Sequence, residues 1–220
     1  MRRSPVQTLV ISAFEPEIAP LRRLMRGTRG VSMAAVGIGA VEAAVGAARA
    51  IAAARPKRVF FVGTAGVYGR AATPALDAAA VAGDLFLVST AALRGDGYLP
   101  EPTIVRATTS PRLRAVLARA AGSEPLGVAC PLAITRSAAV ARRIATATGA
   151  ALENLEVFAV ARAAAAAEVD FAAVLGIANR VGPSAHAEWR AHHQAASNEA
   201  CSLLAPLLGE GSPFTKNPRI

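Results

Sequence analysis

Acidic and amide side chains follow two predicted strands in the second half of the chain. Glu153 and Glu156 lie where a short apolar strand is expected to end and an alanine-rich helix to begin. Asn179 follows the next strand-like run, which covers residues 171–177. In an open α/β sheet, ligands bind at the edge where the strands end. We therefore expect an acid and an amide to share one pocket, and this pair suits a nucleoside, with a diol for the carboxylate and a heterocycle for the amide.

A second pair of acids stands where the first predicted strand gives way to the first predicted helix. Glu15 lies just before this helix and Glu17 just inside it. Negative charge in the first turn stabilises a helix through its dipole, and this effect alone would explain at least one of the two residues. The functional alternative is that one of these carboxylates faces the pocket and acts as a base for water.

Two glycine-containing turns also follow predicted strands. Residues 63–66 read Gly-Thr-Ala-Gly, where small residues would let a ligand approach backbone N–H groups and Thr64 could add a hydroxyl. A plain glycine turn explains these four residues equally well. Residues 37–42 begin like a dinucleotide-binding turn, but Glu42 replaces the third glycine and would repel a pyrophosphate. This second segment therefore indicates only a tight turn with close packing of a helix on a strand.

The remaining polar clusters do not indicate a metal or a cofactor. His186, His192 and His193 share one predicted helix, and only His186 with a neighbouring carboxylate approaches the spacing of metal ligands. The sequence has neither a Gly-x-Ser-x-Gly elbow nor a P-loop. Cys130 and Cys201 are far apart in apolar surroundings, which predicts buried free thiols rather than a disulfide.

The charge distribution argues against nucleic acid and membranes as partners. The net charge is +9, but nearly all of it is arginine scattered over predicted helices, and aromatic residues make up only 5%. This pattern is typical of solvated helix faces rather than a nucleic-acid surface. The longest apolar stretches are interrupted by Glu42, Arg49 and Arg162, so none reaches the ~20 residues of a membrane span. We expect a soluble protein of the cytoplasm.

Apolar runs of strand length alternate with longer alanine-rich segments of helical character, which predicts an α/β fold with a largely parallel sheet covered by helices on both faces. The strands are expected at residues 6–13, 31–36, 59–62, 85–89, 126–130, 150–153 and 171–177. The helices are expected at residues 16–25, 40–54, 111–121, 137–148, 155–167 and 185–208.

The chain divides into one predicted domain and a short tail. Residues 1–209 form the domain, and residues 210–220, which lack periodicity, form a tail that is mobile or packed on another subunit. Within the domain, residues 66–106 contain several prolines and glycines and only one good strand, so we expect a loop-rich region there.

The motifs taken in order resemble the purine nucleoside phosphorylase/nucleosidase family. The segments that carry the resemblance are residues 13–17, 37–39, 63–66, 154–156 and 177–179. Within that family the chain looks most like the nucleosidase branch, which comprises futalosine hydrolase and methylthioadenosine/adenosylhomocysteine nucleosidase. The resemblance implies a single α/β domain with a twisted, mixed central sheet, and commonly a homodimer or a larger homo-oligomer.

The resemblance also implies roles for individual residues. Glu156, rather than Glu153, matches the acid that grips the ribose hydroxyls. Leu155 matches the apolar residue under the sugar. Glu17 matches the carboxylate that orients the attacking water. Asn179 stands where nucleosidases of adenine nucleosides carry the aspartate that protonates the purine.

Three further positions of the family site are matched in this sequence. Thr64 and Gly66 would lie beside the site of the water or anion, and Ile134 near the backbone that contacts the base. An amide at Asn179 both donates and accepts hydrogen bonds, which suits a 6-oxopurine better than adenine. The predicted activity is therefore hydrolysis of a purine nucleoside, without a cofactor or a metal, that releases free base and sugar.

Two alternatives stay open at this point. The family's nucleosidases usually have arginine and serine where this chain has Leu175 and Ala178, which allows a nucleoside-binding protein without catalysis. A phosphate-dependent phosphorylase is the other alternative. The phosphorylases' arginine-containing phosphate loop is not evident here, and a carboxylate at Glu17 would repel phosphate, so hydrolysis is favoured.

Overall fold

The computed structural model describes residues 7–69, 75–88, 105–209 and 211–214. Within this part of the chain, eight strands form one mixed sheet. They are β1 (Thr8–Ser12), β2 (Val31–Ala35), β3 (Arg58–Val67), β4 (Ala79–Val88), β5 (Val105–Thr108), β6 (Leu126–Pro131), β7 (Leu152–Glu153) and β8 (Asp170–Arg180). Neighbouring strands follow the order β2-β1-β3-β7-β6-β4-β5, and β8 pairs with both β3 and β4. The strands β3, β8, β4, β6 and β7 therefore close into a ring.

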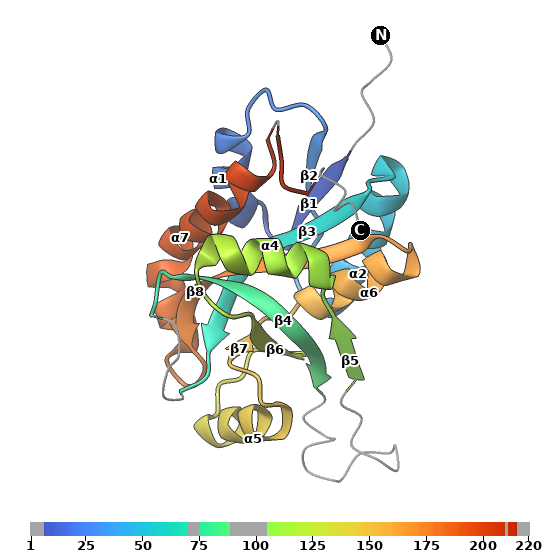
Figure 1. Cartoon of the computed structure of the whole chain (residues 1–220). Coiled ribbons are helices and arrows are strands. Elements are labelled where there is room, and N and C mark those ends of the chain that lie inside the picture. The colour runs from blue at the N-terminus through green and yellow to red at the C-terminus, as the bar shows by residue number, and fades with distance from the viewer. Residues whose placement is uncertain (1–6, 70–74, 89–104, 210, 215–220) are drawn as a thin grey trace.

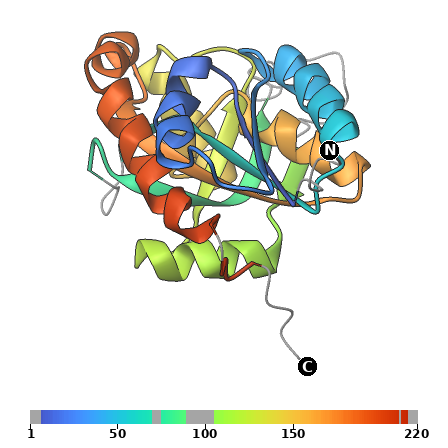
Figure 2. The same ribbon diagram turned by 90° about the horizontal axis from the view of Figure 1, so that it is seen from above.

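Helices cover both faces of this sheet, as the sequence predicted (Figure 1). They are α1 (Glu15–Leu24), α2 (Ala40–Ala54), α4 (Pro111–Ala121), α5 (Ala138–Thr148), α6 (Val157–Ala166) and α7 (Ala185–Leu204), which continues into a short 3₁₀ turn (Ala205–Leu207). Seen from above, α2 and α6 lie on one side of the sheet and α1, α4 and α7 on the other (Figure 2). The result is the single α/β domain with a mixed sheet that the family resemblance implied.

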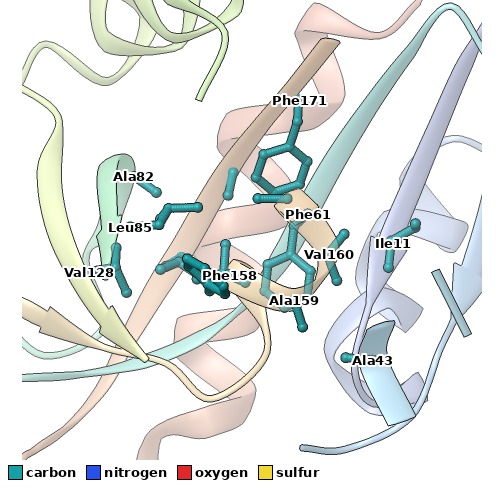
Figure 3. Close-up of a cluster of buried hydrophobic side chains, with 14 of the residues drawn as sticks. Ile11, Ala43, Phe61, Ala82, Leu85, Val128, Phe158, Ala159, Val160 and Phe171 are labelled. Atoms are coloured by element: carbon teal, nitrogen blue, oxygen red, sulfur yellow. The ribbon is translucent and has the colours of Figure 1, made fainter. Parts of the chain in front are cut away.

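The long strand β3 contributes to the apolar core on both of its faces. Phe61 points toward α2 and α6, where it belongs to one buried cluster with Phe158 and Val160 (Figure 3). Phe60 and Val62 point the other way and pack with α1, α4 and α7. Alternate side chains of a strand face opposite sides of the sheet, so a strand buried on both faces must be apolar throughout. Replacing either phenylalanine by alanine would cost about 3–5 kcal/mol of stability.

A glycine sets how closely β8 lies against α7. A methyl group on Gly176 would overlap the carbonyl oxygen of Ala196 in the middle of that helix. Neither backbone can yield there without disturbing its own hydrogen-bond ladder. Strand and helix are therefore in direct backbone contact at Gly176.

The predicted helices and strands match the observed ones except between β3 and α4. The bounds of α2 and α4 are those predicted. The expectation of a loop-rich region over residues 66–106 is wrong in part, because β4 already begins at Ala79 and a further strand, β5, begins at Val105. Alanine has low strand propensity, but here the backbone of β4 pairs with β8, β6 and β5, and this pairing decides the conformation.

The described part of the predicted tail packs on the core. Within residues 210–220, the segment 211–214 brings Phe214 against Phe60, with the ring centroids 4.9 Å apart, and Phe214 is only 2% exposed. Arg112 of α4 also donates a hydrogen bond to the Phe214 carbonyl. Burial of an aromatic ring anchors this part of the segment to the domain.

Two further predictions concern the chain as a whole. None of the described helices is long and apolar enough to cross a membrane. Cys130 and Cys201 are both buried free thiols, which confirms the prediction from their apolar surroundings. Burial raises the pKa of Cys201 to about 11, so this thiol stays protonated at neutral pH.

Candidate active site

A cavity of about 300 Å³ lies at the carboxyl ends of β1, β3 and β8. The first turns of α1 and α7 and the segment before α6 complete its walls. All of the residues that the sequence predicted for a site line this cavity: Glu17, Thr64, Gly66, Ile134, Leu155, Glu156 and Asn179. Segments separated by more than a hundred residues in the sequence are thus brought to one place by the sheet.

Glu17 is a buried carboxylate of the cavity wall that accepts three hydrogen bonds. Its Oε1 accepts hydrogen bonds from the Thr64 N–H at 3.1 Å and from the Thr64 hydroxyl at 2.6 Å. Its Oε2 accepts a hydrogen bond from the Ser12 hydroxyl at 3.0 Å. Burial raises the pKa of Glu17 to about 7, against the opposing effect of these donors. A carboxyl group with such a pKa can accept a proton from water near neutral pH.

Trp189 of α7 extends this hydrogen-bond chain. Its Nε1–H donates to the Thr64 hydroxyl at 3.0 Å, and that hydroxyl donates in turn to Glu17. The hydroxyl of Thr64 thus accepts a hydrogen bond from Trp189 and donates its own hydrogen to the Glu17 carboxylate. Trp189 belongs to none of the motifs that predicted the site, although it is the only tryptophan of the chain and shares a predicted helix with three histidines.

The three histidines of α7 do not converge. His186 and His193 both stack with Trp189, with ring centroids 6.1 Å and 4.5 Å from its ring. His192 instead pairs with Asp77 at 3.2 Å. In the part of the chain that the structure describes, no three His, Cys, Asp or Glu side chains are grouped so that they could hold a metal ion.

Glu156 is held at the start of α6 by two neighbouring segments. Its Oε1 accepts a hydrogen bond from the Gly39 N–H at 2.9 Å, so the glycine turn before α2 binds this carboxylate. Asn154 caps α6, because its Oδ1 accepts from the N–H groups of Glu156 and Val157 at 2.9 and 2.7 Å. The Asn154 amide also donates to the Thr64 carbonyl at 2.9 Å. Burial raises the pKa of Glu156.

Glu153 adds a third carboxylate to the cavity wall. It accepts hydrogen bonds from the Tyr68 hydroxyl at 2.7 Å and from the Thr135 N–H at 3.1 Å. Burial raises the pKa of Glu153, and both donors oppose the rise. Tyr68 is buried beside this carboxylate and its own pKa is raised for that reason. The family pattern gave no role to Glu153.

A β-bulge turns Asn179 toward the cavity. Leu175 and Ile177 of β8 face the core under α2 and α6, and simple alternation would place residue 179 on that side too. The register with β3 shifts here, because Ala65 pairs with Ile177 but Gly66 pairs with Asn179. Ala178 is the extra residue, and its insertion directs the Asn179 side chain over Gly66.

The remaining walls are apolar and partly open. Leu155 lies between the two buried carboxylates of its segment, Glu153 and Glu156. Ile38 and Ile134, which are 62% and 52% exposed, stand at the solvent side of the same cavity. The polar groups are therefore concentrated at the closed end, and apolar side chains at the open end.

The arrangement of these motifs has a counterpart among known proteins. Residues 12–209 match the sequence model of the phosphorylase superfamily, PNP_UDP_1. The chain belongs to this family. Within the phosphorylase superfamily, a futalosine hydrolase of Streptomyces coelicolor is 34% identical over 128 residues, which are 55% of this chain and 54% of that protein. The chain thus spans about half the length of this curated relative.

Solved structures of the same superfamily share the fold. Futalosine hydrolase of Helicobacter pylori superposes with a TM-score of 0.79 at 19% identity, over 90% of this chain and 96% of that one. The 5′-methylthioadenosine/S-adenosylhomocysteine nucleosidase of the same organism, solved with butyl-thio-DADMe-Immucillin-A, gives a TM-score of 0.81 at 18% identity, over 92% and 98%. At these identities the likeness establishes the fold.

Proposed function

We propose that this chain hydrolyses the N-glycosidic bond of a purine nucleoside. The observation that carries the proposal is the pairing of two buried carboxylates with an amide in one cavity of about 300 Å³. Glu17 has a pKa of about 7, Glu156 is fixed at the start of α6, and Asn179 lies over Gly66. Hydrolases of the phosphorylase superfamily that resemble this chain support the same reaction.

The chemistry follows from what glycosidic cleavage requires. As the bond between C1′ and the base nitrogen breaks, its electron pair goes to the base and the sugar acquires oxocarbenium character. Glu156 accepts hydrogen bonds from the ribose hydroxyls and offsets that positive charge. Glu17 takes a proton from water, whose oxygen forms the new bond to C1′. The departing base takes up a proton from solvent, Glu17 later returns the proton of the water to solvent, and Asn179 stabilises the base by donating a hydrogen bond.

The charge of the cavity favours water over phosphate as the nucleophile. Among the described residues that line it, three are carboxylic acids and none is an arginine or a lysine. A phosphate dianion would meet like charge without a compensating cation. Water carries no such penalty.

The 6-oxopurine nucleosides, futalosine among them, are the substrates that we favour. One amide hydrogen of Asn179 is engaged by the Arg180 carbonyl at 3.0 Å. The second hydrogen and the amide oxygen stay available to a base. In a 6-oxopurine the oxygen O6 and the ring nitrogen N7 are both acceptors, which suits the free amide hydrogen.

We test the function with a panel of futalosine, inosine and methylthioadenosine, each incubated with and without phosphate. Chromatography of the released bases is the measurement. The expected result is free base and free sugar without phosphate. No turnover of any substrate would reject catalysis, and turnover only with phosphate would reject hydrolysis. Leu175 and Ala178 are buried and do not line the cavity. Nucleoside binding without cleavage is the outcome that would favour a non-catalytic role.

A homo-oligomer is the second part of the proposal. Large apolar side chains are exposed at the cavity and in the chain segments beside it: Ile38 and Ile134 line the cavity, Val41 and Val45 follow Ile38 on α2, and Leu132 precedes Ile134. Contiguous exposed apolar surface is typical of interfaces. A second copy of this chain would cover these residues and close the open end of the cavity. The cytoplasmic location stays a prediction.

A further inference from the structure

Glu153 is a buried carboxylate of the cavity wall that the proposed reaction leaves without a role. It is 7% exposed, and it lines the cavity together with Glu17 and Glu156. A buried acid without a counter-charge lowers stability unless its hydrogen bonds compensate. This makes Glu153 a candidate for contact with a ligand.

The sheet places Glu153 opposite Asn179. Gly66 of β3 pairs with Glu153 of β7 on one side and with Asn179 of β8 on the other. Adjacent strands lie about 4.8 Å apart, so the two flanking residues are separated by roughly 10 Å across the glycine. The Asn179 amide nitrogen lies over Gly66, where an added Cβ would stand only 2.7 Å from it. The carboxylate and the amide line the same cavity, so both can contact one heterocycle bound there.

The hydrogen bonds of Glu153 fix what it can offer to a ligand. The Thr135 backbone N–H can only donate, and it occupies one lone pair of Oε1 at 3.1 Å. The Tyr68 hydroxyl, at 2.7 Å from Oε2, occupies one lone pair of the other oxygen. Both donors stabilise the ionised form, which retains acceptor capacity and has no hydrogen to give. Glu153 is therefore an acceptor that faces the cavity.

We propose that Glu153 accepts the N1–H of a 6-oxopurine base and thereby selects such bases over adenine. A 6-oxopurine carries a hydrogen on N1, whereas adenine presents a lone pair there, which an ionised carboxylate repels. The inference rests on the proposed function for the position of the base. It goes beyond that function by naming the residue that reads the N1 position.

Binding of free bases tests this role without requiring turnover. Calorimetry measures hypoxanthine, 1-methylhypoxanthine and adenine with the wild-type chain, Glu153→Gln and Glu124→Gln. Glu124 is exposed in the turn after α4 and serves as a matched control. We expect the wild type and the control to bind hypoxanthine at least about tenfold more tightly than the other two bases. In Glu153→Gln the amide can donate to N1, so the hypoxanthine-to-adenine preference should fall below about threefold.

A second variant keeps the test open if Glu153→Gln does not fold. Tyr68→Phe removes one donor and leaves the carboxylate in place, so Glu153 gains a proton more readily. The hypoxanthine preference should then weaken as the pH falls from 8 to 6, while the wild type changes less. Glu17 of the same cavity also titrates near pH 7, so a purely structural Glu153 would give Tyr68→Phe the same pH dependence of base preference as the wild type.

The outcomes separate this inference from the proposed reaction. An unchanged base preference in Glu153→Gln overturns the role of Glu153, even if the wild type cleaves nucleosides. If the wild type cleaves none, but its base preference depends on Glu153 as stated, the reaction is wrong and the role of Glu153 stands. If the wild type binds none of the three bases, the role of Glu153 is overturned, and the reaction is still judged by turnover of the nucleoside panel.

Discussion

At the scale of single residues, Glu17 combines burial with three hydrogen-bond donors. Burial alone would leave the carboxyl neutral, and strong donors alone would leave it a weak base. The balance between these effects raises its pKa from 4.5 to about 7. A base is most useful when its pKa is near the working pH. The raised pKa also means that the ionised form of Glu17 lowers the stability of the folded state, and this loss can be measured.

Glu17→Gln should abolish base release and stabilise the fold at alkaline pH. The folded state holds the Glu17 proton more tightly than the unfolded state. The wild type therefore loses stability as the pH rises from about 4.5 to about 7. The Gln side chain can accept from Thr64 and donate to Ser12, so the variant should gain about 2–3 kcal/mol at pH 8 relative to the wild type. At pH 5 this gain should be much smaller. Denaturant unfolding at the two pH values is the measurement, and an equal gain at both would contradict the assignment.

Thr64→Val should shift the pH dependence of hydrolysis toward higher pH. Because the ionised form of Glu17 is the base, kcat/KM should rise through pH ~7 in the wild type. Loss of the hydroxyl donor at 2.6 Å raises the pKa further, by on the order of one unit. Thr64→Ser retains the donor and should keep the wild-type profile. An unshifted profile in Thr64→Val would show that Glu17 is not the group that titrates.

At the scale of elements, the start of α6 couples stability to ribose binding. One side chain, Asn154, caps the helix and ties it to β3 through the Thr64 carbonyl. Two residues later, Glu156 directly precedes the first residue of α6 and accepts a hydrogen bond from the N–H of Gly39. A shift of α6 therefore displaces the carboxylate that is proposed to hold the sugar. Asn154 therefore both caps α6 and fixes the position of Glu156 in the cavity.

Asn154→Ala should lower both stability and substrate affinity. Loss of the cap and of the buried amide hydrogen bond should cost about 1–3 kcal/mol in the free energy of unfolding. A displaced Glu156 should raise KM more than it lowers kcat. Asn154→Ser keeps an N-cap acceptor and should recover most of the stability but not the bond to Thr64. Thermal unfolding and steady-state kinetics of the two variants are the measurements; a wild-type KM in Asn154→Ala would refute the coupling.

Much of this arrangement of elements could be predicted from the sequence, and the failures have a common cause. The helices α2 and α4 have strong local signals, a periodic alanine-rich stretch and a proline at the helix start. The strand β5 and the early part of β4 have no such signal, because their conformation depends on pairing with distant strands. The inward turn of Asn179 depends on a bulge, which is likewise visible only once β8 is paired with β3.

In the site too, residues in sequence motifs could be predicted, whereas residues placed by tertiary packing could not. The residues that the family motifs singled out all line the cavity, but their roles are still to be measured. Trp189 and Glu153 could not be assigned in this way. Their positions depend on where α7 and β7 lie relative to β3, and residue spacing along the chain does not contain that information.

At the scale of the whole molecule, the exposed apolar side chains predict how copies associate. Val41 and Val45 lie one turn apart on α2 and are 73% and 53% exposed. Ile38, which precedes them, already lines the cavity. An interface on this surface would link subunit association to the shape of the site.

Val41→Glu should convert a homodimer or larger oligomer to a monomer. A buried charge without a partner is strongly unfavourable at an apolar interface. Leu24→Glu, on the exposed end of α1, is the matched control and should leave the assembly unchanged, since Leu24 is 56% exposed and lies outside the proposed interface. Light scattering after size exclusion is the measurement. A wild-type chain that is already monomeric would rule out this interface.

The backbone contact between Gly176 and Ala196 has a consequence for the design of inhibitors. It leaves no gap between β8 and α7, the elements that carry the Asn179 and Trp189 walls of the cavity. Gly46 of α2 lies equally close to the Val36 carbonyl, beside the segment that carries Ile38. Medicinal chemistry on this cavity should therefore keep the edge of a compound that faces Asn179 and Trp189 compact, and should test larger groups at the exposed Ile38 and Ile134 on the assembled oligomer.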